Sequence, residues 1–159
     1  MKKVSDFLSK MISGFLFVFI IVLTAITFLQ VLSRFVFRIP IVWSEEVVRM
    51  SFVWIIFLGS AIAVKEGTHL TLDMIASAFN ERWRHIIRMI LLGLIFIAAG
   101  IICYAGFNYV IRNIGKTTVT MPIPANVFYI SAPISGLLMM FFVIEQFIYQ
   151  TKEHQKGEK

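Results

Sequence analysis

Two long stretches without a charged residue constrain the fold of this chain more than any other feature. They run from Met11 to Ser33 and from Met89 to Ile111, 23 residues each. At 1.5 Å rise per residue, a helix of this length reaches about 34 Å, enough to cross a hydrocarbon core of about 30 Å. Only 15% of the 159 residues are charged, against roughly 25% in soluble domains. The pattern indicates membrane-spanning helices.

A third apolar stretch predicts a further span, but it is short. Only the 15 residues from Met50 to Val64 lie between Arg49 and Lys65, and about 22 Å of helix cannot cross the membrane. The helix must therefore begin earlier, near Pro40 or Ser44, where a proline at the first helical position is tolerated.

The last apolar stretch is interrupted by proline. We expect its helix to begin near Ala125 or Asn126 and to kink at Pro133, where the preceding turn loses a hydrogen bond. The sequence thus predicts an all-α membrane protein, one integral membrane domain over residues 1–159, with four spans and an amphipathic cytoplasmic-side segment between the second and third. The predicted spans cover about 11–37, 42–64, 87–111 and 125–149.

The longest polar segment, Lys65 to Arg88, has apolar residues at helical spacing and polar residues on the opposite face. This pattern favours a helix lying along the membrane surface, broken near Asn80, which would cap the third span. An extended amphipathic start to the third helix is the alternative. On the surface, three arginines would meet anionic lipid headgroups: Arg82, Arg84 and Arg88.

Basic residues are divided unevenly between the two sides of the membrane. Because the number of spans is even, both termini and the central segment share one side, which holds ten Lys and Arg against five on the other. Since cytoplasmic loops carry the excess of basic residues, we expect both termini in the cytoplasm. The same excess of basic residues in cytoplasmic segments accounts for the net charge of +6. The charge therefore does not imply a nucleic-acid partner.

Residues with catalytic or ligand chemistry are sparse. His69 and Asp73 are four positions apart and could hold a metal on a helix, but two ligands are a weak signal. All three histidines lie outside the apolar stretches, so no ligand pair for a membrane haem is available. No nucleophile lies beside a membrane-embedded base. We predict no catalytic, substrate-binding or metal site and no cofactor.

Transport by this chain alone also fits poorly. Ion-coupled carriers usually hold buried ionisable residues and broken helices around a central site. Here the first span contains no acid, and its most polar deep residue is Gln30, a residue type that usually makes an interhelical hydrogen bond.

The most informative cluster is W-S-E-E-V-V-R at residues 43–49. Glu46 and Arg49 are three positions apart, so they share a helix face and are expected to pair. Two interpretations stay open: an interfacial ion pair with Trp43 as an aromatic belt residue, or an assembly contact with a partner subunit. The candidates for such a contact are Trp43, Glu45, Glu46, Arg49, Trp54, Gly59, His69 and Asp73.

This cluster belongs to three consecutive segments that resemble the small, DctQ-like membrane subunit of tripartite ATP-independent periplasmic (TRAP) transporters. The segments are W-S-E-E-V-V-R at 43–49, F-V-W-I-I-F-L-G-S-A at 52–61 and K-E-G-T-H-L-T-L-D at 65–73. The last half of the chain resembles the family mainly in topology, together with M-P-I-P-A at 121–125. The family's small subunit has no established catalytic residues, so none is carried over.

The resemblance implies a bacterial or archaeal secondary transporter of three parts: a periplasmic substrate-binding protein, a large membrane subunit that moves substrate, and this small one. It implies a non-catalytic scaffold in the inner membrane that stabilises the large subunit during sodium-coupled import of an organic acid, of the C4-dicarboxylate or sialic acid class. Membrane lipids are further expected partners. The alternative is an autonomous four-helix membrane protein, either a small homo-oligomeric carrier or an assembly factor. Two small-residue pairs suit close helix contact: Gly59 with Ala63, and Ala132 with Gly136.

Overall fold

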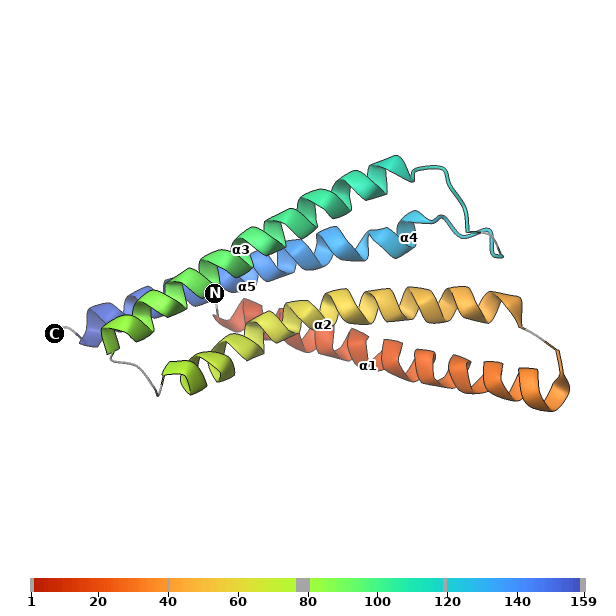
Figure 1. The fold of residues 1–159 in the computed structure, drawn as a ribbon, viewed down its shortest axis with the longest axis horizontal. Helices are drawn as coiled ribbons and strands as arrows, with labels where there is room; N and C mark the ends of the chain where they lie inside the picture. Colours follow the sequence, from red (N-terminus) through yellow and green to blue (C-terminus); the bar gives the residue numbers. More distant parts are fainter. Residues whose placement is uncertain (1, 40, 77–80, 119, 158–159) are drawn as a thin grey trace.

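The computed structural model describes residues 2–39, 41–76, 81–118 and 120–157, and four long helices dominate them (Figure 1). The elements are α1 (Lys2–Leu32), the π-helical turn η1 (Ser33–Phe37), α2 (Val42–Ala76), α3 (Glu81–Arg112), the short α4 (Asn126–Tyr129) and α5 (Ser131–Gly157). Among these described residues, four stretches are long and apolar enough to span a membrane: Lys3–Phe37, Val42–Glu66, Ile86–Arg112 and Asn126–Tyr149. The predicted all-α membrane fold is confirmed.

A tight reversal joins α1 to α2. The Ser33 carbonyl accepts hydrogen bonds from the N–H groups of Arg38 and Ile39, and the Ser33 hydroxyl donates back to the Ile39 carbonyl. Arg38 adopts the left-handed region, with φ of 55°, which turns the chain. The Ser44 hydroxyl then donates to the Ile41 carbonyl over 2.6 Å at the start of α2. The second helix therefore begins well before Arg49, as its length required.

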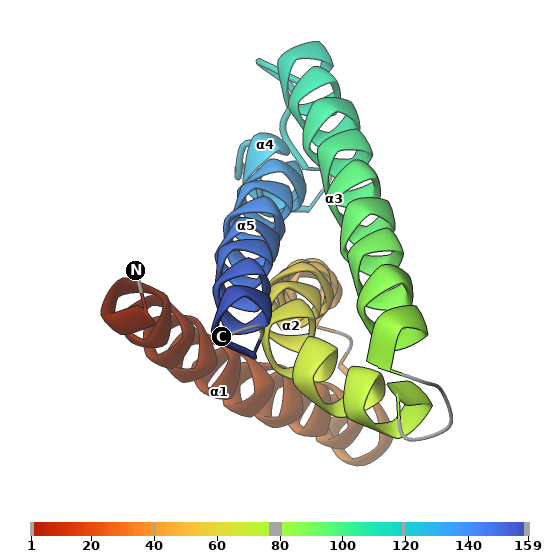
Figure 2. The ribbon, with the colours of Figure 1, turned by 90° about the vertical axis from the view of Figure 1, so that its left-hand side faces the viewer.

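Helix α2 lies at the centre of the arrangement. It packs against α1 on one side and α5 on the other, and α5 packs against α3. The order in space is therefore α1, α2, α5, α3, and Figure 2 shows α1 running at a steep tilt across the other three. Each of the four long helices contributes to a small buried core, which consists of Ile12, Leu58, Ala61, Ala99, Met139 and Phe142.

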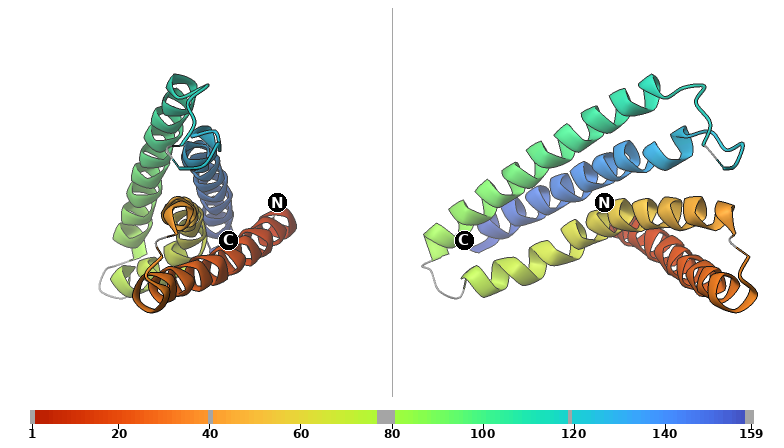
Figure 3. Two further views of the ribbon diagram at one scale, coloured as in Figure 1. Left: turned by 90° about the vertical axis from the view of Figure 1, so that its right-hand side faces the viewer. Right: turned by 45° about the vertical axis from the view of Figure 1, so that its right-hand side comes forward.

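Helix α1 contacts the rest of the chain through a single seam. A row of its buried and half-buried positions recurs at alternating steps of four and three residues, which is the spacing of a coiled-coil seam. The row consists of Ser5, Ser9, Ile12, Leu16, Phe19, Leu23, Ile26 and Gln30 and continues to Ser33 in η1, and the half-buried Leu8 and Val22 flank it. None of the most apolar 18 residues of this span is buried, against 44% of the corresponding residues in the fourth span. The two views of Figure 3 show α1 diverging from α3 and α5.

Small residues bring α3 and α5 close together. A Cβ atom added at Gly136 would lie 2.9 Å from both the Cβ and the backbone nitrogen of Cys103, and one added at Gly106 would lie 2.7 Å from the Pro133 ring. The predicted small-residue pair of Ala132 and Gly136 is therefore used within the chain. Around Gly59, in contrast, a Cβ atom would meet nothing within 4 Å.

The amphipathic segment from Lys65 to Arg88 is not a separate surface helix, which corrects that prediction. Helix α2 continues through Lys65 to Ala76, and α3 begins at Glu81. Extending an existing helix adds one hydrogen bond per residue, whereas a new helix needs a costly nucleus and leaves its end groups unpaired. The alternative of an extended start to the third helix holds from Glu81 onward. Asn80 lies outside the described residues.

The effect of Pro133 is an interruption between α4 and α5 at Ile130, one turn before the proline. Proline cannot donate to the carbonyl of Tyr129, and its ring crowds that carbonyl. The chain continues across the break, because the Ile130 N–H donates to the Asn126 carbonyl over 2.9 Å and the Ile134 N–H to the Ile130 carbonyl over 3.3 Å. Helix α4 begins at Asn126, as predicted for the fourth span.

Candidate functional site

The motif at residues 43–49 forms the first turns of α2, and its ion pair differs from the predicted one. The Arg49 guanidinium lies 3.2 Å from the Glu45 carboxylate, and both side chains are about two-thirds exposed, at 67% and 70%. The predicted pairing of Arg49 with Glu46 is therefore wrong. Spacing explains the difference, because a glutamate four residues before a cation on a helix is the favoured arrangement.

Glu46 instead binds the connection between α3 and α4. Its carboxylate accepts a hydrogen bond of 2.9 Å from the Thr120 backbone N–H, and the Thr118 side chain and Met121 backbone also face it. The connection is folded on itself, since the Thr118 N–H donates to the Ile123 carbonyl over 3.0 Å. Glu46 thereby fixes this connection against α2.

Trp54 makes a second contact of the same kind. Its indole N–H donates to the Val127 carbonyl in α4 over 3.1 Å, and its ring stacks on Phe19 of α1 with centroids 6.0 Å apart. Trp54 and Glu46 were both predicted as assembly residues. The structure shows that both hold the chain's own elements together.

A polar cluster that the sequence did not single out lies at the other end of the spans. The Lys65 ammonium is 2.8 Å from the Asp6 carboxylate and 2.8 Å from the Ser9 hydroxyl, both in α1. It also lies 5.7 Å from the centroid of the Phe142 ring in α5, a distance typical of a cation–π contact. Lys65 therefore joins three helices at one point.

Gln146 completes this cluster from α5. Its amide N–H groups donate to the carbonyls of Val64 and Lys65 over 3.1 and 3.0 Å. The available sequence signal was an amide inside an otherwise apolar span, because such a group needs a partner there. The same reasoning was applied to Gln30, yet the Gln30 side chain makes no hydrogen bond within the described part of the chain.

The remaining predicted residues fall into two groups. Trp43 is exposed, Arg88 is half-buried, and Gly59 lies on an open helix face. The other side chains lie outside the described part of the structure, and they are His69, Asp73, Arg82 and Arg84. Within the described residues, no three His, Cys, Asp or Glu side chains come together as a metal site would require. The contacts described above join helices of the same chain.

Comparison with known proteins relates most of the chain to one family. The model of the DctQ component of tripartite ATP-independent periplasmic transporters matches residues 23–153. A putative TRAP transporter small permease protein of Haemophilus influenzae is 28% identical over 159 residues, which cover 95% of this chain and 92% of the relative.

Two further relatives carry more specific descriptions. The sialic acid TRAP transporter small permease protein SiaQ of Vibrio cholerae is 27% identical over 124 residues, 78% of this chain and 72% of SiaQ. The sialic acid TRAP transporter permease protein SiaT of Haemophilus influenzae is 27% identical over 142 residues, which cover 87% of this chain but only 22% of SiaT. In SiaT, the region similar to this chain is therefore part of a much longer permease.

Proposed function

Because the chain belongs to the DctQ component family of tripartite ATP-independent periplasmic transporters, we propose that it acts as a scaffold that binds and stabilises a large permease subunit. In this role the small subunit contacts no substrate. SiaT supports the choice of partner, since its region similar to this chain is one part of a longer permease protein.

The observation that carries this proposal is that the four helices bury only a small part of their apolar surface against one another. Large apolar side chains point outward on every span; examples are Phe28, Phe52, Ile97 and Leu137. A broad exposed apolar surface in a membrane protein contacts lipid or another membrane subunit. A scaffold needs such a surface, because a moving partner requires a wide, fixed counterpart in the bilayer.

The buried polar groups also favour a subunit without its own ion or substrate site. Ion-coupled carriers depend on ionisable side chains inside the membrane. In the described part of this chain, the buried polar residues are serines and one glutamine: Ser5, Ser33, Ser44, Ser51, Ser131, Ser135 and Gln146. None of them is ionisable, which is consistent with substrate and sodium sites in the large subunit.

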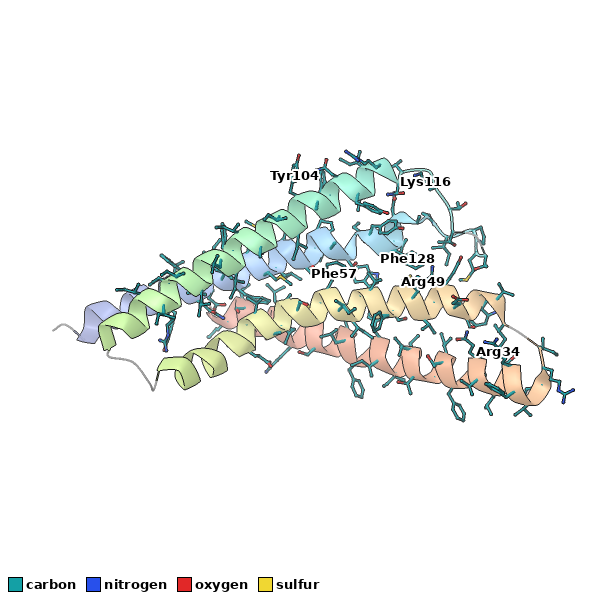
Figure 4. All side chains as sticks on the ribbon, in the orientation of Figure 1. Arg34, Arg49, Phe57, Tyr104, Lys116 and Phe128 are labelled. Atoms are coloured by element: carbon teal, nitrogen blue, oxygen red, sulfur yellow. The ribbon has the colours of Figure 1, made fainter. Side chains whose placement is uncertain are left out.

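The complete transporter, in this proposal, imports an organic acid of the C4-dicarboxylate or sialic acid class together with sodium, and a periplasmic binding protein delivers the substrate. The chain lies in the inner membrane with both termini in the cytoplasm. Figure 4 shows Arg34, Arg49 and Lys116 toward one end of the molecule, and Figure 1 shows the C-terminus at the opposite end. These three are among the five basic residues counted on the side opposite the termini, and their shared position supports this orientation.

Reconstitution tests the scaffold role directly. Proteoliposomes would contain the large subunit, this chain, or both, with the binding protein and candidate organic acids outside and an inward sodium gradient. We expect sodium-dependent uptake only with both membrane subunits, and a large subunit that is less stable when purified alone. Uptake by this chain without a partner would instead identify an autonomous carrier.

A further inference from the structure

We propose that the outward face of α2 is the surface that binds a transmembrane helix of the large permease subunit, an inference that rests on the function proposed above. This α2 outer face consists of Glu45, Arg49, Phe52, Ile56, Gly59 and Ala63. All are exposed except Gly59, which is partly exposed.

The residues of the α2 outer face form one narrow stripe. They recur at alternating steps of four and three residues, which keeps them on one side of a helix. The opposite side of α2 is already occupied, because Trp54 contacts α1 and α4, and Lys65 contacts α1 and α5. Helix α2 therefore has one face used within the chain and one face left for another occupant.

The charges on this face favour protein over lipid as the occupant. Arg49 and its partner Glu45 remain largely exposed, and Arg49 lies two helical turns inside the span that begins at Val42. A charge within a span is unfavourable by about 2.5–3.5 kcal/mol at the centre and by less near the interface. The outward faces of α1 and α3 lack charge over residues 11–33 and 89–111, so lipid covers them without this penalty.

The shape of the face suits a helix rather than bulky side chains. A Cβ atom added at Gly59 meets nothing within 4 Å, and the exposed Ala63 lies one turn further on. Two small residues four positions apart let another helix backbone approach closely. The occupant is a helix of the large permease, since in SiaT the region similar to this chain lies within a longer permease.

Paired substitutions separate this face from the other open surfaces. The tagged chain would be co-expressed with the large TRAP permease subunit of the same organism, and the amount of large subunit that co-purifies would be measured. Gly59→Leu fills the close-approach position and should lower that amount at least tenfold. Gly93→Leu is the matched control, because Gly93 on α3 also has nothing within 4 Å, and it should leave the amount unchanged.

A second variant tests the charges without adding bulk. Glu45→Gln combined with Arg49→Gln should also lower co-purification several-fold, while the melting temperature of each isolated variant stays near that of the natural chain. If Gly59→Leu lowers that temperature, maleimide labelling decides the question. In a Cys103→Ala background, Ile56→Cys should react at least tenfold more slowly in the complex than in the isolated chain, and Ile97→Cys should react equally in both.

The possible failures are distinguishable. If the natural chain does not retain the large subunit, the proposed function is wrong and this inference fails with it. If the natural chain retains it but Gly59→Leu and Gly93→Leu retain it equally, or position 56 stays reactive in the complex, then another face binds the permease. Cross-linking of Ile56→Cys to a second copy of this chain within the complex would likewise overturn the assignment.

Discussion

Gly136 occupies a position at which a single methyl group has a defined effect. Its missing Cβ would lie 2.9 Å from the Cys103 backbone nitrogen and 3.0 Å from the Ala99 carbonyl oxygen, and backbone atoms cannot move aside easily. We expect Gly136→Ala to destabilise the chain by about 1–3 kcal/mol through overpacking. Thermal unfolding in detergent micelles would measure this loss.

The matched control at the same scale is Gly93→Ala. Its added methyl group meets open space, and alanine exceeds glycine in helix propensity by about 1 kcal/mol. This variant should be neutral or slightly more stable. Equal destabilisation by the two changes would show that the approach of α5 to α3 is not as close as described.

Glu46 offers a second residue-scale prediction, about the connection between α3 and α4. Glu46→Ala removes the acceptor of the Thr120 N–H, and a hydrogen bond to a charged group contributes about 1.5–3 kcal/mol. Hydrogen exchange at the Thr120 amide should therefore accelerate roughly tenfold or more. Glu45→Ala removes only an exposed ion pair and should leave this exchange rate unchanged, whereas equal acceleration would assign the effect to the helix end in general.

At the scale of elements, Lys65 links α1 to α2. A double-mutant cycle of Asp6→Ala and Lys65→Ala should give a coupling energy below about 1 kcal/mol, because Asp6 is largely solvent-exposed. The coupling should still exceed that of Glu45 with Arg49, since the Lys65 side chain is only 18% exposed. Chemical unfolding would supply both cycles, and strict additivity for Asp6 and Lys65 would contradict the described contact.

The elements themselves were predictable from the sequence, because the run of uncharged residues sets the minimum length of a span. The requirement that the second helix begin before Arg49 followed from length alone, and α2 begins at Val42. The site was less predictable. Local spacing paired Glu46 with Arg49, whereas the partner of Glu46 is Thr120, 74 residues further along the chain. Such partners depend on which helices become neighbours, and the periodicity of one helix does not determine that.

The same limit applies to the polar residues inside the spans. Gln30 and Gln146 look alike in the sequence, but only Gln146 faces carbonyl groups of another helix. The extent of α2 was also missed, since an amphipathic pattern between two spans is compatible both with a surface helix and with a longer span. In the structure α2 continues as one helix to Ala76, so the longer helix is the correct alternative.

For the whole molecule, the prediction concerns orientation in the membrane. In a Cys103→Ala background, a cysteine at position 116 should react with an impermeant maleimide in intact spheroplasts, whereas one at position 156 should react only after the membrane is opened. The physical basis is the excess of basic residues on the cytoplasmic side. Labelling of position 156 in intact spheroplasts would invert the orientation.

The spatial order α1, α2, α5, α3 has a consequence for how the chain is made. Two of its three main interfaces, α1 with α2 and α3 with α5, join consecutive spans, so each forms a helical hairpin from neighbouring sequence. Because contacts between nearby segments form early, the first hairpin can close while the second is still being synthesised. The chain is then expected to assemble as two helical hairpins, α1 with α2 and α3 with α5. The interface between α2 and α5 forms last.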